Sequence, residues 1–252
     1  MLSALQRRAP VAAPQSSNRN VRVCVASFAP PTVGETKAKF FAGYSKPVAS
    51  IYSTVLQELL VQQHFMRYSK NYNYNQIFAL GFVSVYEQIL ESLPEEERAA
   101  IFKAYVNALG EDPEQYKRDA AAIEQAASSL TGPTDLTPDA SGNAVQAALA
   151  AIASATADNS FAYSKFVAIG LFRLLELTGA KEPAALEKLV KAVGVKPEAV
   201  NRDLMMYKGV LSKLSAAKEM MREFVEREKR KQAERDAAKA AKAEAATASA
   251  QA

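Results

Sequence analysis

Apolar side chains recur at steps of three and four residues along residues 45–64, the spacing that places them on one face of an α-helix. The positions are Val48, Ile51, Tyr52, Val55, Leu56, Leu59 and Leu60. Ser45 is a suitable N-cap, and Pro47 fits the first turn, where its missing backbone N–H costs nothing. A stripe this broad requires other helices around it. The pattern therefore predicts the central helix of an all-α domain.

Start and stop signals predict helices on both sides of this segment. Thr32 and Glu35 have the spacing of a capping box, which would open a short helix ahead of the central one. Asp112 followed by Pro113 is an N-cap with proline at the first helical position. The remaining helices are predicted over residues 77–93 and 95–109, and the asparagine- and serine-rich residues 68–75 read as a loop.

Residues 131–142 have the composition of turns, which predicts a mobile surface loop. Beyond Val200 a last helix carries apolar residues near a seven-residue spacing and then becomes charged, so we expect it to project as a single helix or a weak coiled coil. The alanine-rich end is predicted to be disordered. The predicted fold is an all-α multi-helix bundle with a long protruding C-terminal helix.

Part of the helical pattern occurs twice. The segment Tyr-x-x-x-x-Ala-x-Gly at 74–81 recurs 89 residues later at 163–170, and Gly-x-x-Pro-Glu with a following Arg-Asp recurs between 110–119 and 194–203. A helix stop followed by a helix start could produce the second match alone. With both matches in the same order, we predict two related three-helix units and a close helix crossing at Gly81 and Gly170.

Charge is unevenly distributed. The formal net charge is +4, yet residues 1–34 hold four arginines and no acid, and the remainder has 27 basic and 27 acidic residues. This leader is rich in alanine, serine, arginine and proline, the composition of an organelle transit peptide, although an ordinary disordered terminus remains an alternative. We therefore divide the chain into a leader, 1–34, an all-helical domain, 35–216, and a charged arm with its tail, 217–252.

Few residues suggest catalysis. Cys24 is the only cysteine and His64 the only histidine, and no glycine-rich phosphate loop is present, which argues against nucleotide chemistry. Glu58 lies six residues before His64, a spacing that matches neither of the usual helical metal motifs. A structural His64 is favoured, with a metal-dependent enzyme around Glu58 and His64 as the lesser alternative. No cofactor, metal or nucleic acid is expected.

The charged C-terminal helix is the candidate surface for a partner. Its acidic residues weaken the case for a lipid surface, and a solvated helical face is the simpler reading, but contact with a membrane surface stays open. No apolar stretch approaches the length needed to span a bilayer. The candidate partner-binding residues are Lys218, Arg222, Arg227, Lys229, Arg230 and Lys231.

Six separated segments together resemble the Thylakoid Formation family over about residues 33–230. They lie at 35–40, 46–52, 58–64, 77–81, 163–172 and 203–207. Gln62 departs from the glutamate usual in the family, which further weakens a carboxylate–histidine metal site.

The resemblance implies a chloroplast transit peptide and a place in the stroma and at the stromal face of the thylakoid membrane. It also implies a non-enzymatic factor that binds or stabilises the thylakoid FtsH protease complex and so supports photosystem II repair and thylakoid biogenesis. A chaperone that acts directly on photosystem subunits is the alternative.

Overall fold

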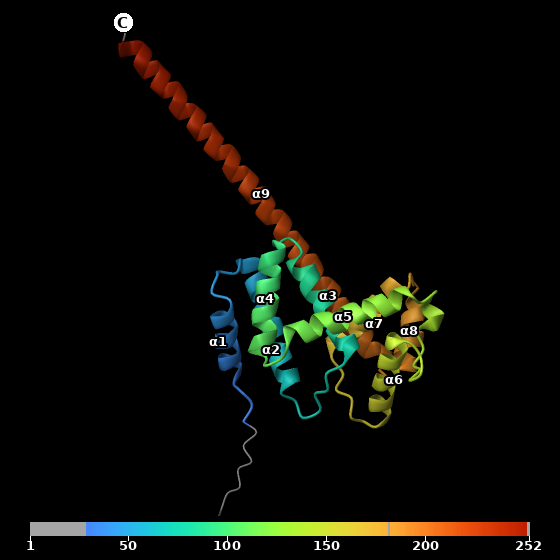
Figure 1. The fold of residues 1–252 in the computed structure, drawn as a ribbon. Helices are drawn as coiled ribbons and strands as arrows, with labels where there is room; N and C mark the ends of the chain where they lie inside the picture. The colour runs from blue at the N-terminus through green and yellow to red at the C-terminus, as the bar shows by residue number, and fades with distance from the viewer. Residues whose placement is uncertain (1–28, 181, 251–252) are drawn as a thin grey trace, which may run out of the picture. The chain divides into compact units, whose positions relative to one another are not determined.

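The computed structural model describes residues 29–180 and 182–250, with side chains up to residue 239, and within these residues the chain is helical without strands. Residues 1–28 of the predicted leader lie outside the described part. The elements are α1 (Val33–Gly43), α2 (Ser50–Arg67), α3 (Gln76–Leu90), α4 (Glu95–Ala108), α5 (Pro113–Ser128), the 3₁₀ turn η1 (Pro133–Asp135), α6 (Ala144–Ala157), α7 (Lys165–Leu177), α8 (Pro183–Ala192) and α9 (Pro197–Ala250) (Figure 1). The all-α prediction is confirmed.

Two of the predicted helix starts are confirmed. Thr32 and Glu35 form the full capping box of α1, and Asp112 caps α5 with Pro113 in its first turn. The start of α2 was predicted wrongly, because the helix begins at Ser50 and not at Ser45. A residue that precedes proline is disfavoured in the helical region, so Lys46 cannot continue a turn from Ser45 into Pro47.

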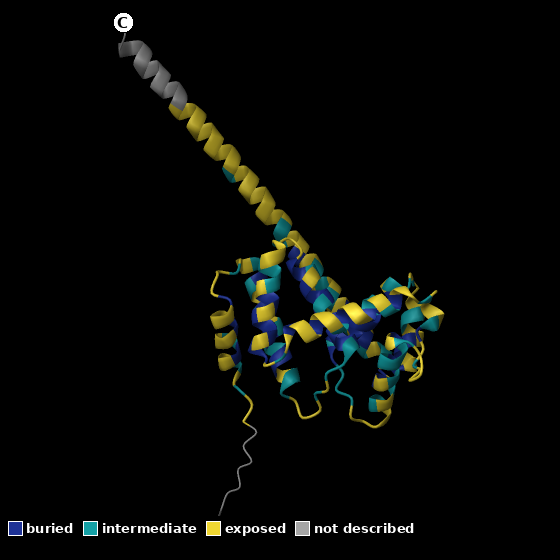
Figure 2. Ribbon diagram, viewed as in Figure 1, coloured by how far each residue is buried: buried dark blue, intermediate teal, exposed yellow. Residues whose placement is uncertain are grey.

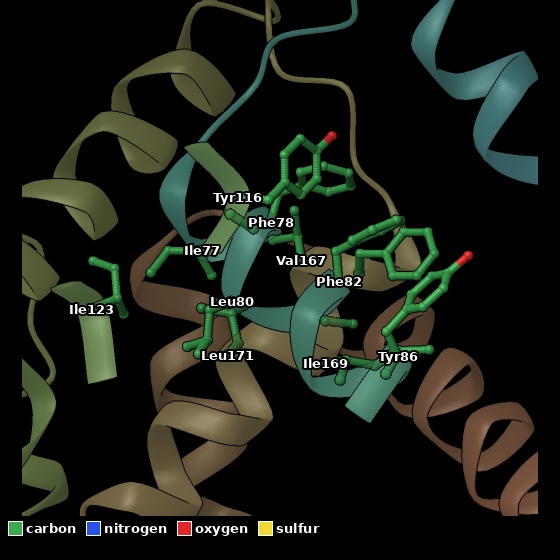
Figure 3. Packing of buried hydrophobic residues seen from close by; sticks show 14 of the residues in the cluster. Ile77, Phe78, Leu80, Phe82, Tyr86, Tyr116, Ile123, Val167, Ile169 and Leu171 are labelled. Atoms are coloured by element: carbon green, nitrogen blue, oxygen red, sulfur yellow. The ribbon is translucent and has the colours of Figure 1, made fainter. Parts of the chain in front are cut away.

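Helices α3 and α7, not α2, form the centre of the body. Nearly every side of α3 is buried, whereas α2 buries one face. Figure 3 shows side chains of α3 pointing toward those of α5 and α7, with the rings of Phe78 and Tyr116 close together. A helix that is apolar all round is one that lies inside. Helix α2 is therefore a covering helix of the body.

The two central helices touch backbone to backbone at their glycines. A Cβ atom added at Gly81 would overlap the carbonyl oxygen of Phe166, and one added at Gly170 would overlap the carbonyl oxygen of Ile77. Phe166 follows Ile77 by the same 89 residues that separate the glycines. The predicted close crossing is confirmed, and it relates the two helices by an approximate two-fold axis.

The predicted repeat is confirmed by matching contacts in its two copies. Tyr74 donates a hydrogen bond to Asp119 at 2.7 Å, and Tyr163 donates to Asp203 at 2.8 Å. The second helix of each copy ends on a glycine of positive φ, at Gly110 and at Gly194. One copy is thus α3 to α5, and the other is α7, α8 and the first part of α9.

The structure extends the repeat by one helix that the sequence analysis did not predict. Helix α6 precedes α7 as α2 precedes α3, and α6 packs against α5 as α2 packs against α9. Three of the five buried residues of α2 recur in α6 at the same spacing, 89 residues later. These are Leu56, Leu60 and Gln63 in α2, and Val145, Leu149 and Ile152 in α6.

Helix α9 leaves the body and continues as the arm, residues 217–250 (Figure 1). Figure 2 shows most of its described side chains exposed. The alanine-rich end, predicted to be disordered, is helical up to Ala250. Alanine has the highest intrinsic helix propensity, which accounts for the difference. Among the described residues, no helix combines the length and apolar character needed to cross a membrane.

We expect Gly81→Ala to lower the free energy of unfolding by more than about 3 kcal/mol, because the added methyl group must displace backbone and not a flexible side chain. Urea unfolding measures the change. Gly209→Ala is the matched control: it lies inside α9 with open space around it, so alanine should stabilise by up to about 1 kcal/mol. Equal effects of the two substitutions would contradict the crossing.

Candidate functional site

The arm carries an apolar band where it leaves the body. Met220, Met221, Phe224 and Val225 are 43–66% exposed, and they lie one turn apart on neighbouring stripes of α9. Met221 and Val225 continue the spacing by which Leu204, Leu211 and Leu214 pack on the body. We call these four exposed residues the apolar band. Exposed apolar side chains gathered in this way mark surfaces that bind other molecules.

Lys218, one of the predicted partner-binding residues, lies at the base of the arm in contact with the body. Its ammonium lies 3.5 Å from a carboxylate oxygen of Glu91 and 5.8 Å from the ring centroid of Tyr52, and its side chain is only 20% exposed. The residue holds the base of the arm against α2 and the end of α3. Arg222, one turn further on, is exposed but still lines a shallow cavity with Tyr52.

The other predicted cations lie on the projecting part. Arg227, Lys229 and Arg230 are exposed, whereas Lys231 pairs with Glu228 at 3.1 Å along the helix. Exposed ion pairs of this kind contribute little to stability, so they leave the cations available to a partner. The structure therefore places three predicted residues together next to the apolar band.

A second surface lies between α2 and α9. A groove of about 580 Å³ is floored by α3 and α7 and walled by apolar side chains of α2 and α9. The polarity along it is graded. The lining residues at one end are Ile51, Ile89, Leu214 and Ala217, with the exposed Lys213 at the rim, and those at the other end are Glu58, Gln62, Tyr163, Lys165, Arg202 and Asp203.

Most of the polar end is internally satisfied. Asp203 accepts the hydrogen bond from Tyr163 and lies 3.6 Å from the Arg202 guanidinium, and the Glu58 carboxylate accepts from Gln62 at 3.0 Å. Burial, followed by the Asp203 carboxylate, raises the pKa of Tyr163, which keeps its hydroxyl a donor. Lys165 has no ion-pair partner among the described residues, and burial lowers its pKa against the opposing effect of Glu58 and Asp203.

Glu58 and His64 do not form a site. Glu58 borders the groove, whereas His64 is buried among Thr36, Phe65 and Tyr68. Thr36 Oγ1 lies 2.9 Å from His64 Nδ1, so the imidazole has a structural partner. Six residues turn an α-helix by about 240°, which points the two side chains apart. No group of three potential metal ligands is found among the described residues.

Sequence reasoning missed both the exposure of the apolar band and the groove. The sequence analysis recognised the apolar residues that recur near a seven-residue spacing beyond Val200, but this pattern alone could not show where the body ends beneath them. The groove joins residues of four helices that are up to 166 residues apart, Ile51 to Ala217, and no local motif marks it.

Comparison with known proteins gives consistent matches over this body and arm. A sequence model described as thylakoid formation protein matches residues 32–236. The chain is 51% identical to THYLAKOID FORMATION1, chloroplastic, of Oryza sativa subsp. japonica over 88% of this chain and 79% of that one. It is 31% identical to Protein Thf1 of Nostoc sp. over 82% and 94% of the two chains. The solved structure of Psb29 superposes with a TM-score of 0.65 at 30% identity, covering 81% of this chain and all of that one.

We expect the free energy of unfolding to fall as the pH falls below about 6.5, the pKa of an ordinary histidine. Burial lowers the pKa of His64, so the unfolded chain binds this proton more readily than the folded protein. The contribution of neutral His64 to the free energy of unfolding is complete above about pH 6.5, and it declines as the pH falls toward the lowered pKa of His64 in the folded protein. Urea unfolding of His64→Asn across pH 5–8 should lose this part of the slope. An unchanged slope would show that His64 is not its source.

Proposed function

This chain belongs to the thylakoid formation protein family, and we propose that it acts in thylakoid biogenesis in the chloroplast as a non-enzymatic adaptor of the thylakoid FtsH protease complex. In this role it would stabilise the protease complex and so support photosystem II repair. The plant relatives named chloroplastic support the compartment. The partner follows from the family resemblance of the sequence segments described above.

The observation that supports an adaptor role is the arrangement of exposed apolar and basic residues where the arm leaves the body. Lys218 contacts Glu91 and Tyr52 at the base of the arm, so the apolar band and its cations begin where α9 leaves the body. A partner gains most from burying a compact apolar cluster, while surrounding charges set orientation and association rate. Phe224 with Met220 and Met221 is such a cluster, and Arg227 and Arg230 are exposed cations on the turns that follow it.

We propose the stromal face of the thylakoid as the place of this contact. The basic residues of the arm can approach an anionic lipid surface, where each exposed cation contributes about 1 kcal/mol. Interleaved acids such as Glu226 and Glu234 limit that attraction, so the membrane would supply proximity while the protein partner supplies specificity. The chain then acts as a peripheral protein that reaches its partner with the arm.

Crosslinking capture from solubilised thylakoids tests the adaptor role. We expect the full chain to recover FtsH subunits, and the double variant Met220→Ala/Phe224→Ala to recover at least tenfold less, because truncating a central apolar contact costs more than 1 kcal/mol per residue. Arg227→Gln/Arg230→Gln should weaken capture at low salt and much less at high salt, since exposed charges are screened.

Met205→Ala is the matched control, because Met205 is also an exposed methionine of α9 but lies on the body. The free energy of unfolding of each of these variants should lie within about 0.5 kcal/mol of that of the native chain. Capture of photosystem subunits without the protease would replace the adaptor by a direct assembly chaperone. Capture of FtsH that is equal in all variants would leave the body, and not the arm, as the contact.

A further inference from the structure

The two copies of the repeat provide an internal comparison for the groove between α2 and α9. The equivalent position in the other copy lies between α6 and α5, and those helices pack through the same buried triplet. Alanine occupies the positions that correspond to four large side chains of the groove walls, whereas Tyr207 and Leu214 correspond to Ile123 and Leu130. The matched pairs are Val55 with Ala144, Leu59 with Ala148, Met206 with Ala122, and Val210 with Ala126.

The fold therefore does not need these large apolar walls. Val55 and Leu59 pack against the core but are only partly buried, and Met206 is 62% exposed, so none of the three belongs to the fully buried core. The charged groups of the groove are likewise replaced by uncharged residues in the other copy, where Glu58 corresponds to Ala147 and Lys165 corresponds to Gln76. Both the apolar walls and the charges at one end are additions to a shared helical scaffold.

The dimensions and the polarity of the groove define what it can hold. The α2 wall from Ile51 to Gln62 is about 16 Å long at 1.5 Å per residue. A single leaflet of a bilayer is about 15 Å of hydrocarbon, half of the roughly 30 Å core, so the wall is about as long as the space that one acyl chain spans in a leaflet. The volume of about 580 Å³ lies within the usual range for small-molecule sites.

The polar end favours an anionic head group. The two carboxylates there already have partners, Asp203 with Tyr163 and Arg202, and Glu58 with Gln62. Lys165 is the charged group of the floor without an ion-pair partner among the described residues. Lys165 is also the first residue of α7, where the helix dipole adds to the attraction for an anion.

We propose that the groove binds a single-chain acyl amphiphile, with the chain along α2 and α9 and an anionic head group at Lys165. The carboxylate of a free fatty acid and the phosphate of a lysolipid share this chemistry. The site does not rest on the proposed function, because the four residues of the apolar band lie further along α9 and do not line the groove.

Equilibrium dialysis of radiolabelled palmitate against the full chain tests the site. We expect saturable binding of one palmitate per chain, and at least tenfold weaker binding to Val55→Trp and Val210→Trp, in which an indole occupies the groove. Two variants on different helices guard against a local folding defect. Met205→Trp is the matched control, because Met205 is exposed on the same helix but does not line the groove.

The head group is tested with Lys165→Gln, which installs the residue of the other copy. Palmitate should bind about tenfold more weakly, the loss expected for one charge-assisted contact, while hexadecanol should bind as before. Lys188→Gln, at an exposed site on α8, should change neither. Competition by palmitoyl lysophosphatidylglycerol, compared with palmitate itself, identifies which of the two head groups is preferred.

The absence of saturable palmitate binding, or binding unaffected by both tryptophan variants, would overturn the proposal. If the tryptophan variants instead lost FtsH capture while the native chain bound no palmitate, the groove would be a docking site for a protein helix. Retained palmitate binding in the Met220→Ala/Phe224→Ala variant separates this inference from the adaptor role, because either result can fail without the other.

Discussion

The backbone contact between α3 and α7 is the constraint on which the rest of the structure depends. Gly81 and Gly170 let the two helices approach until each meets a carbonyl group of the other, a separation that any side chain would prevent. Glycine inside a helix costs about 1 kcal/mol relative to alanine. The close approach offsets this cost by bringing Phe78 and Phe82 within ring contact of Phe166. The orientation of the two repeat copies is fixed at this crossing.

The sequence was sufficient for the fold class and for the repeat, because both depend on local signals. Capping at Thr32 and Asp112 is a matter of side chains within three residues, and the recurrence of Gly81 as Gly170 is visible directly. The central helix was assigned to α2 because its stripe is regular. A regular stripe indicates one buried face, whereas the all-round apolar character of α3 was the better signal of a central position.

The candidate surfaces were less accessible to sequence reasoning, because charge and hydrophobicity do not reveal which face is covered. Lys218 and Arg227 look alike in the sequence, but one is held by Glu91 and Tyr52 and the other is exposed. The groove required the tertiary arrangement, and its interpretation required α6, which was not predicted. Helix α6 has only three large buried apolar residues among many alanines, so its pattern is weak even though its propensity is high.

The two copies of the repeat have diverged, so the same helical scaffold carries a large apolar face on α2 and an alanine face on α6. The buried triplets of α2 and α6 remain equivalent because they pack against the same core, whereas the neighbouring faces are free to differ. In α6 that face consists of alanine residues. In α2 it carries Val55 and Leu59, and the facing side of α9 carries Met206 and Val210. Ile51 lies at the junction, since it lines both the groove and the cavity beneath the arm. Any displacement of α2 from α9 must therefore change both the width of the groove and the contacts of Lys218 with Glu91 and Tyr52.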